Sequence, residues 1–227
     1  MKYKLFRWLP VFLLFILPAV SSQLKAQKTS LLFTPDHKDE WYTFLQKSGR
    51  NADPLNVFRF DGQTLQITGE DIGYIITTKT FGEFHLSLEF KWGEKKYPPR
   101  ENQIRDAGVL YFAQTFTGDR IWPLAFECQI QEGDCGDFWL IGGAQMVNKD
   151  TLTPAGGGFR VIKSKDAEKP HGEWNTIEIM VKDGKITHKV NGQVVNTGSK
   201  PSLTRGRILL QSEAAEVFFR NIKLVEY

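Results

Sequence analysis

The chain has 227 residues, of which 24% are charged and 41% hydrophobic, and its formal net charge is +3. This length suits a single domain with a sizeable core. Part of the positive excess lies at the N-terminus, and no basic stripe follows. The charge therefore leaves no electrostatic case for nucleic acid as a partner.

The first 26 residues are typical of a secretion signal peptide. Basic residues open the chain, and the apolar run Val11–Val20 is too short to span a bilayer. Small residues follow, so cleavage is expected after Ser21, with Ala26 as the alternative. No Cys lies here, so a lipoprotein anchor is not indicated; an uncleaved membrane anchor is the competing interpretation. We expect an exported protein, in the periplasm or outside the cell, whose mature domain at 27–227 has no integral membrane segment.

Strand patterns recur along the rest of the chain, and no long helical periodicity is present. The runs expected to form strands are Ile75–Lys79, Phe84–Trp92, Gly108–Phe112, Phe126–Glu132, Trp174–Lys182, Lys185–Val190, Gly206–Ser212 and Val217–Val225. Apolar and polar residues alternate along Phe84–Trp92, which is typical of a half-buried antiparallel strand. Asp183-Gly184 and Asn191-Gly192 each predict a two-residue hairpin turn. These patterns predict an all-β fold, a sandwich or jelly roll of two antiparallel sheets.

Two stretches between the strands are expected to be loops. Residues 95–105 are polar and contain Pro98-Pro99, and residues 155–158 are rich in Gly. Long loops in compact domains are often functional, although a tolerated surface insertion is the alternative.

The strand at Phe126–Glu132 carries an unusual row of polar side chains. Residues two apart point to the same face of a strand, so Glu127, Gln129 and Gln131 form one row. Cys128 and Ile130 point the other way, into a core. Carboxylate and amide groups suit the floor of a sugar-binding groove, because hydroxyl-rich ligands need both donors and acceptors. A solvent-exposed strand face is the alternative.

The sequence predicts no cofactor and no metal site. The four His residues lack metal-ligand spacing, and no dedicated acidic loop is present, although sandwich folds of this kind often carry a structural Ca²⁺. In an exported protein Cys128 and Cys135 could form a disulfide. Two free, buried thiols are the alternative, and the sequence leaves both open.

Several segments together resemble one protein family. The elements that carry the resemblance are Phe84–Phe90 (F-E-L-x-x-E-F in the family), Phe126–Ile130 (Y-E-V-Q-I), Gly172–Ile179 (G-E-W-N-x-x-E-I), and Gly206–Glu213 with Phe219–Ile222 (G-x-I-x-L-Q…F-R-N-I). In this order and spacing they resemble the 3-keto-disaccharide hydrolase family, from about Leu31 to Tyr227. The resemblance implies a concanavalin A-like jelly roll with a concave, sugar-facing sheet. It also implies action on glucosides oxidised to a ketone at C3, so a small carbohydrate is the expected partner.

The chain departs from the family pattern at two places near the expected groove. Asp106-Ala107-Gly108 stands where the family has N-S-G. Ser212-Glu213-Ala214 stands where a small polar residue commonly leads to His-Gly. Both departures bear on which substrate is accepted.

A ketone at C3 acidifies the proton on C2, so a base can remove it while the C1 substituent leaves. Water then adds to the enone, and the net result is hydrolysis. This route needs a base, an acid and donors for the enolate. Glu127 is the expected base, because it begins the polar row. Glu213 is the expected acid, since it shares a strand face with Gln211. Asp137 and Glu132 are reserve candidates.

The remaining candidates would contact the substrate. The expected donors and acceptors are Gln129, Gln131, Glu132, Gln211 and Arg105, and the expected stacking platforms are Tyr111, Trp122 and Trp139. As alternatives, Glu127 could pair with an arginine such as Arg160, and Glu213 could be a solvent-facing strand end.

Two other functions fit the same expected fold. One is a non-catalytic carbohydrate-binding domain, and the other is a conventional endo-glucanase. Laminarinase-type glucanases carry E-x-D-x-x-E on the floor strand, and retaining hydrolysis needs two close carboxylates. Here the middle acid is the amide Gln129, which weakens the glucanase interpretation.

Overall fold

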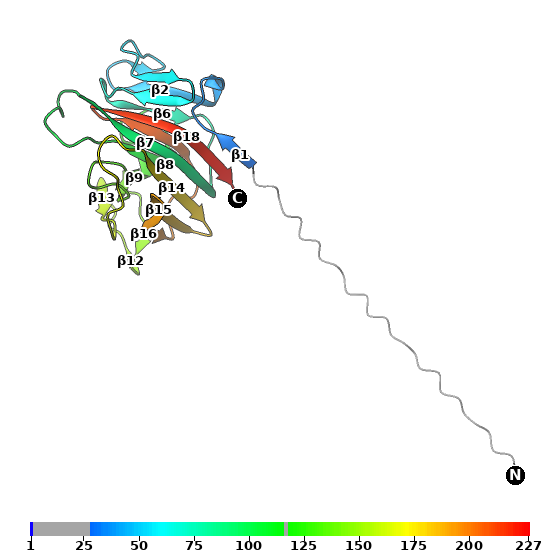
Figure 1. Ribbon diagram of the computed structural model, residues 1–227. Helices are drawn as coiled ribbons and strands as arrows, with labels where there is room; N and C mark the ends of the chain where they lie inside the picture. Colours follow the sequence, from blue (N-terminus) through cyan, green and yellow to red (C-terminus); the bar gives the residue numbers. More distant parts are fainter. Residues whose placement is uncertain (2–27, 116–117) are drawn as a thin grey trace.

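The computed structural model describes residue 1 and residues 28–115 and 118–227 (Figure 1). Apart from residue 1, the predicted signal peptide lies outside the described residues. None of the helical structure described is long and apolar enough to cross a membrane. The described chain folds as two packed antiparallel sheets, and its one helical turn is the 3₁₀ segment η1 (Lys38–Glu40). The predicted all-β jelly-roll class is confirmed.

The two sheets differ in size. In spatial order, the ten-stranded sheet runs β12 (Thr151–Leu152), β11 (Val147–Asn148), β16 (Gln193–Ser199), β15 (Lys185–Val190), β14 (Asn175–Lys182), β7 (Phe84–Lys96), β18 (Ala215–Glu226), β5 (Thr64–Ile67) and β4 (Phe58–Asp61), with β1 (Lys28–Leu31) also paired to β18. The eight-stranded sheet runs β13 (Gly158–Val161), β10 (Phe138–Ile141), β9 (Leu124–Gln129), β8 (Gly108–Gln114), β17 (Arg207–Ser212), β6 (Gly73–Thr77), β2 (Trp41–Leu45) and β3 (Gly49–Arg50).

The core lies between the sheets and follows the predicted alternation. Along β7, Phe84, Leu86 and Leu88 are buried in the main apolar cluster while the intervening side chains face outward. On the facing sheet, Phe126 and Cys128 of β9 point into the same cluster. Burying such a side chain stabilises the fold by roughly 1.5–3 kcal/mol. A register shift of one residue would expose the whole row, so this packing fixes which face of β9 points away from the core.

The two predicted hairpin turns join β14 to β15 and β15 to β16. Asp183 and Gly184 have φ values of +49° and +66°, and Asn191 and Gly192 have +49° and +76°. Positive φ at both central residues is what a type I′ turn requires, and Asn, Asp and Gly tolerate it best. The meander predicted for this stretch is confirmed.

Both cysteines are buried and free. Cys128 and Cys135 belong to the main apolar cluster. Burial raises the pKa of each thiol well above its usual value. Of the two alternatives, the structure therefore has the free, buried thiols.

A polar contact between the sheets lies inside this core. Tyr111 of β8 donates a hydrogen bond to His188 Nε2 of β15 at 3.0 Å, and Nδ1 of the same ring lies 3.3 Å from the Gly136 carbonyl oxygen. The imidazole is thus neutral, with its proton on Nδ1. Burial lowers the pKa of His188 from 6.5 to about 3.

We expect His188 to make the fold acid-sensitive. Above pH 6.5 the ring is neutral in both the folded and the unfolded chain, so its contribution is constant. As the pH falls from 6.5 towards 3, the unfolded chain takes up a proton that the folded chain excludes, which lowers the free energy of unfolding by up to about 5 kcal/mol. In urea titrations across this range, the free energy of unfolding should fall less steeply with decreasing pH for His188→Gln than for the wild type. Equal slopes in the two proteins would contradict the prediction.

Candidate functional site

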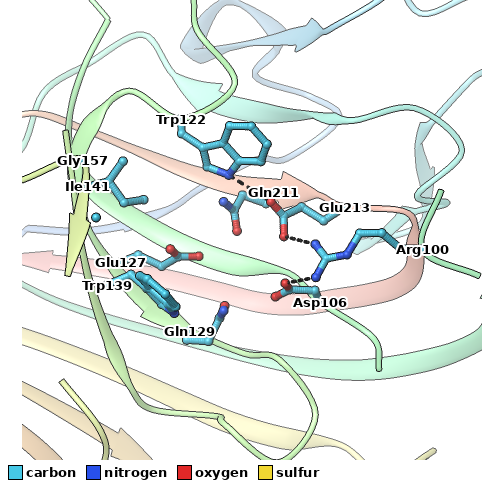
Figure 2. Close-up of a pocket in the computed structure, with 11 residues that line it drawn as sticks. Arg100, Asp106, Trp122, Glu127, Gln129, Trp139, Ile141, Gly157, Gln211 and Glu213 are labelled. Carbon is cyan, nitrogen blue, oxygen red and sulfur yellow. Dashed lines mark hydrogen bonds and ion pairs between the residues drawn. The ribbon is translucent and has the colours of Figure 1, made fainter. Parts of the chain in front are cut away.

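A pocket of about 380 Å³ opens on the face of the eight-stranded sheet that points away from the core (Figure 2). Its lining residues are Arg100, Asp106, Trp122, Glu127, Gln129, Trp139, Ile141, Gly157, Gly158, Gln211 and Glu213. Small-molecule sites in proteins typically enclose about 300–1,000 Å³. The pocket is therefore large enough for a small ligand, which makes it the candidate site.

Two strands supply the polar floor that the sequence predicts. Glu127 and Gln129 of β9 face the pocket, while Cys128 and Ile130 are buried in the core. The predicted register of β9 is thus confirmed. Gln211 of β17 lies across from them, on the other side of β8.

Gly108 on β8 leaves room for these side chains to meet. A Cβ atom at this position would collide with Glu127 Oε1 and Gln211 Oε1. The glycine therefore lets a carboxyl group and an amide group lie over the strand between their own strands. Gln211 Oε1 is buried and accepts no hydrogen bond from the described residues, so it can receive a donor from a ligand.

Glu213 reaches the pocket from a tight connection between the sheets. β17 ends at Ser212 and β18 begins at Ala215, so Glu213 and Ala214 alone link them. Ala214 has φ +61°, and its carbonyl oxygen accepts a hydrogen bond of 2.8 Å from the Tyr97 amide. This strained turn aims the Glu213 carboxyl group back over the polar floor.

Arg100 joins two of the acidic side chains. It comes from the polar loop after β7; its Nη1 donates to Glu213 Oε2 at 3.1 Å, and its Nη2 donates to Asp106 Oδ2 at 2.5 Å (Figure 2). Its Nε donates to Gln103 Oε1 at 3.1 Å. Charge-assisted bonds of this kind are about twice as strong as neutral ones, so the three groups are held as a unit.

Two tryptophans flank the carboxyl groups. Trp122 is half exposed, at 50%, and its Nε1 donates to Glu213 Oε1 at 3.1 Å. Trp139 of β10 is partly buried and borders the pocket beside Gly158. Both line the pocket, where their rings are available to a ligand; stacking on a sugar stays a prediction.

The two pocket glutamates have different electrostatic surroundings. Burial raises the pKa of Glu127 well above its usual value, and the charges of Glu213 and Asp106 raise it further. Burial and Asp106 also raise the pKa of Glu213, while Arg100 and the hydrogen bond from Trp122 lower it, to a resulting value of about 7. Both pKa values are therefore raised by burial, but only Glu213 has a cation and an N–H donor beside it that favour its ionised form.

Several predicted site residues lie elsewhere. Tyr111 is wholly buried between the sheets and bonded to His188, so it cannot stack on a ligand. Asp137 is also fully buried, where its carboxylate accepts hydrogen bonds from Arg160 Nε at 2.6 Å and from the Lys163 amide at 2.7 Å. Asp137 is therefore a structural residue. Arg160, which the sequence offered as an alternative partner for Glu127, pairs with Asp137 instead.

Three further candidates lie behind the pocket. Arg105 bonds to Glu132, with Nη1 3.3 Å from Oε1, and to two backbone carbonyl groups of β7. Gln131 lies beyond the end of β9, where its Nε2 donates to Asp106 Oδ2 at 2.8 Å. None of the three lines the pocket. Gln131 is displaced because β9 ends at Gln129, before the row can continue.

We expect Asp137→Asn to destabilise the fold without a specific loss of activity. An amide has one acceptor oxygen and no charge, so it cannot satisfy both the guanidinium and the backbone donor. The cost should be about 1–3 kcal/mol, reduced because Arg160 is a third exposed. Urea unfolding checks the stability, and kcat/KM per folded molecule should stay within about threefold. A large drop in kcat/KM at native stability would return Asp137 to the catalytic candidates.

The structure adds residues that sequence reasoning missed. Arg100, Asp106, Ile141, Gly157 and Gly158 line the pocket without having been chosen. Weak signals existed for some of them. Arg100 lies in the first predicted loop, Asp106 is the first departure from the family pattern, and the glycines lie in the second loop. Among the described residues, no group of three or more His, Cys, Asp or Glu is arranged to hold a metal ion.

The rest of this sheet face is covered. A second apolar cluster lies there, formed mainly by Tyr42, Tyr74, Ile76, Leu110, Ala125, Ile141 and Leu209. Asp119, from the segment between β8 and β9, accepts hydrogen bonds from the hydroxyl groups of Tyr42 at 2.9 Å and Tyr74 at 3.0 Å. Arg50 Nε donates to its other oxygen at 2.9 Å. The pocket is thus confined to one end of the face.

A jelly-roll β-sandwich with acids, amides and tryptophans in a pocket on one sheet fits a carbohydrate-active protein. A family model described as the 3-keto-alpha-glucoside-1,2-lyase-like domain matches residues 30–225. The chain belongs to this family, so the resemblance predicted from the sequence is confirmed. The comparison with curated proteins gives no match.

Solved structures support the same fold at low sequence identity. A protein titled "putative glycosyl hydrolase" from Parabacteroides distasonis is 20% identical, with a TM-score of 0.60 over 88% of this chain and 100% of that chain. The carbohydrate-binding module CBM66 from Bacillus subtilis is 8% identical, with a TM-score of 0.56 over 81% and 94%. The β-glucanase of Bacillus licheniformis is 10% identical, with a TM-score of 0.53 over 90% and 100%.

Proposed function

We propose that this protein is an exported enzyme that cleaves the glycosidic bond of 3-keto-glucosides. The observation that carries the proposal is the pairing of Glu127 and Glu213, two buried carboxyl groups that reach one pocket from opposite sides of β8. The family match supports a 3-keto sugar as substrate. The basic and apolar N-terminus supports export to the periplasm or cell exterior.

The reaction follows from the acidity of the proton at C2 of a 3-keto sugar. One carboxylate removes this proton, the C1–O bond breaks as C1=C2 forms, and one carboxylic acid protonates the departing oxygen. Water then adds at C1 and the proton returns to C2, which restores both carboxyl groups. Gln129 and Gln211 can hold the sugar oxygens, because each amide offers donors and an acceptor. The tryptophans supply apolar faces for the ring.

Two alternative functions make different predictions. Ordinary retaining hydrolysis is disfavoured because the floor strand has Gln129 where the glucanase pattern has an acid. A non-catalytic sugar-binding domain needs no raised carboxyl pKa, yet Glu127 and Glu213 both have one. Perturbed acids in a pocket favour an enzyme.

One assay separates the three functions. The mature protein is incubated with the native and the 3-keto forms of the same disaccharide, and products are followed by NMR. Turnover of the keto form alone is the expected result. Binding without turnover would support the sugar-binding domain, and turnover of the native disaccharide would support the glucanase.

A further inference from the structure

Of the two pocket glutamates, one is held by partners and the other is not. Glu213 accepts hydrogen bonds from the Arg100 guanidinium and from the Trp122 indole, which satisfy both of its oxygens. Glu127 receives no hydrogen bond or ion pair from any residue that the structure describes. A cation and an N–H donor stabilise the ionised form of a carboxyl group, whereas a buried carboxyl without them favours the neutral form.

From these contacts we propose that Arg100 is a positioning residue that stabilises the ionised form of Glu213, which acts as the base, and that Glu127 is the acid. This inference rests on the proposed function and assigns the two roles opposite to the expectation from sequence. The proton at C2 passes to Glu213, and the proton of Glu127 passes to the departing oxygen. In the hydration step Glu127 takes a proton from water and Glu213 returns its proton to C2.

The neighbouring charges determine in which direction each substitution should shift the pKa of Glu213. Arg100 and the Trp122 hydrogen bond lower the pKa of Glu213, and Asp106 raises it. The charged groups that influence Glu213 are thus Arg100, Asp106 and, across β8, Glu127. Asp106 also shares the guanidinium with Glu213. Arg100 and Asp106 therefore act on Glu213 in opposite senses.

The pH dependence of kcat/KM for a 3-keto-disaccharide provides the first test. Its acidic limb should report ionisation of Glu213 near pH 7. Arg100→Met should move this limb upward by about one pH unit or more, because an adjacent cation shifts a carboxyl pKa by that much. Asp106→Asn should move it downward. Arg105→Met is the matched control, since Arg105 pairs with Glu132 outside the pocket, and it should leave the limb in place.

A second measurement needs no turnover. Carboxyl ¹³C chemical shifts of the glutamates, recorded against pH in the wild type and in both variants, give the order of ionisation directly. Glu213 should ionise at lower pH than Glu127, and its titration should move in opposite directions in the two variants. Ionisation of Glu127 first, or an Arg100→Met titration identical to wild type, would overturn the assignment. The expected order without turnover of any 3-keto-glucoside would instead refute the proposed function and leave the electrostatic arrangement standing.

Discussion

Glu127→Gln should lower the turnover of a 3-keto-disaccharide by about 10²-fold or more, because a positioned acid or base contributes about that much. The amide keeps the shape of the side chain, so substrate binding should be largely kept. If Glu127 is the acid, the turnover of a nitrophenyl 3-keto-glucoside by this variant should fall much less, since its leaving group hardly needs a proton. Glu213→Gln should impair both substrates. Near-normal turnover of the disaccharide by Glu127→Gln would remove Glu127 from the catalytic pair.

The same substitution should make the protein more stable at neutral and alkaline pH. Because the folded-state pKa of Glu127 is raised, the unfolded chain ionises first as the pH rises above about 4.5. Stability is then lost progressively up to the folded-state pKa, and Gln removes this loss. In thermal unfolding, the increase in melting temperature of the variant over the wild type should be larger at pH 8 than at pH 5. A gain that is equal or larger at pH 5 would argue against a raised pKa.

Gly108→Ala should be the most damaging small substitution in the pocket. The added methyl group would collide with Glu127 and Gln211, whose side chains lie over this residue. Overpacking of this kind costs about 1–3 kcal/mol, and a displacement of about 1 Å from a productive geometry can cost about 10²-fold in rate. Both kcat/KM and the urea midpoint should therefore fall.

The matched control is another glycine-to-alanine change in a loop. A methyl group at Gly156 would meet no atom within 4 Å beyond its own chain neighbours, and this residue does not have a positive φ. Gly156→Ala should therefore keep near-normal stability and activity. A Gly108→Ala enzyme with unchanged kcat/KM would show that the space above β8 is not used for catalysis.

Local patterns were enough to predict the longer strands, such as β7 and β18, and the face of β9. Alternation along Phe84–Trp92 and the Asp183-Gly184 turn each depend on the backbone conformation of a few residues, so they are readable before the fold is known. The same holds for Glu127 and Gln129, whose direction is set by strand parity. Gln131 was misplaced because parity holds only while a strand continues, and β9 ends at Gln129.

The rest of the site depends on contacts between distant segments. Arg100 and Glu213 are far apart in sequence, and only the packing of the loop after β7 against the β17–β18 turn brings them together. Tyr111 was predicted to be a stacking ring in the pocket. Its strand carries apolar side chains on both faces, so the alternation of side chains could not show which face points into the core and which into the pocket. The prediction that Asp137 could be catalytic was wrong for a related reason. A buried acid with a structural arginine partner looks the same in sequence as a catalytic one.

The covered part of the sheet face has a consequence for the size of the ligand. Asp119 is held over the end of the face by hydrogen bonds from Tyr42, Tyr74 and Arg50. These side chains occupy the space into which the pocket would otherwise extend. A polymer strand lying along this sheet would run into that barrier. We therefore expect the pocket to accept short glycosides and terminal sugar units more readily than the interior of a long chain.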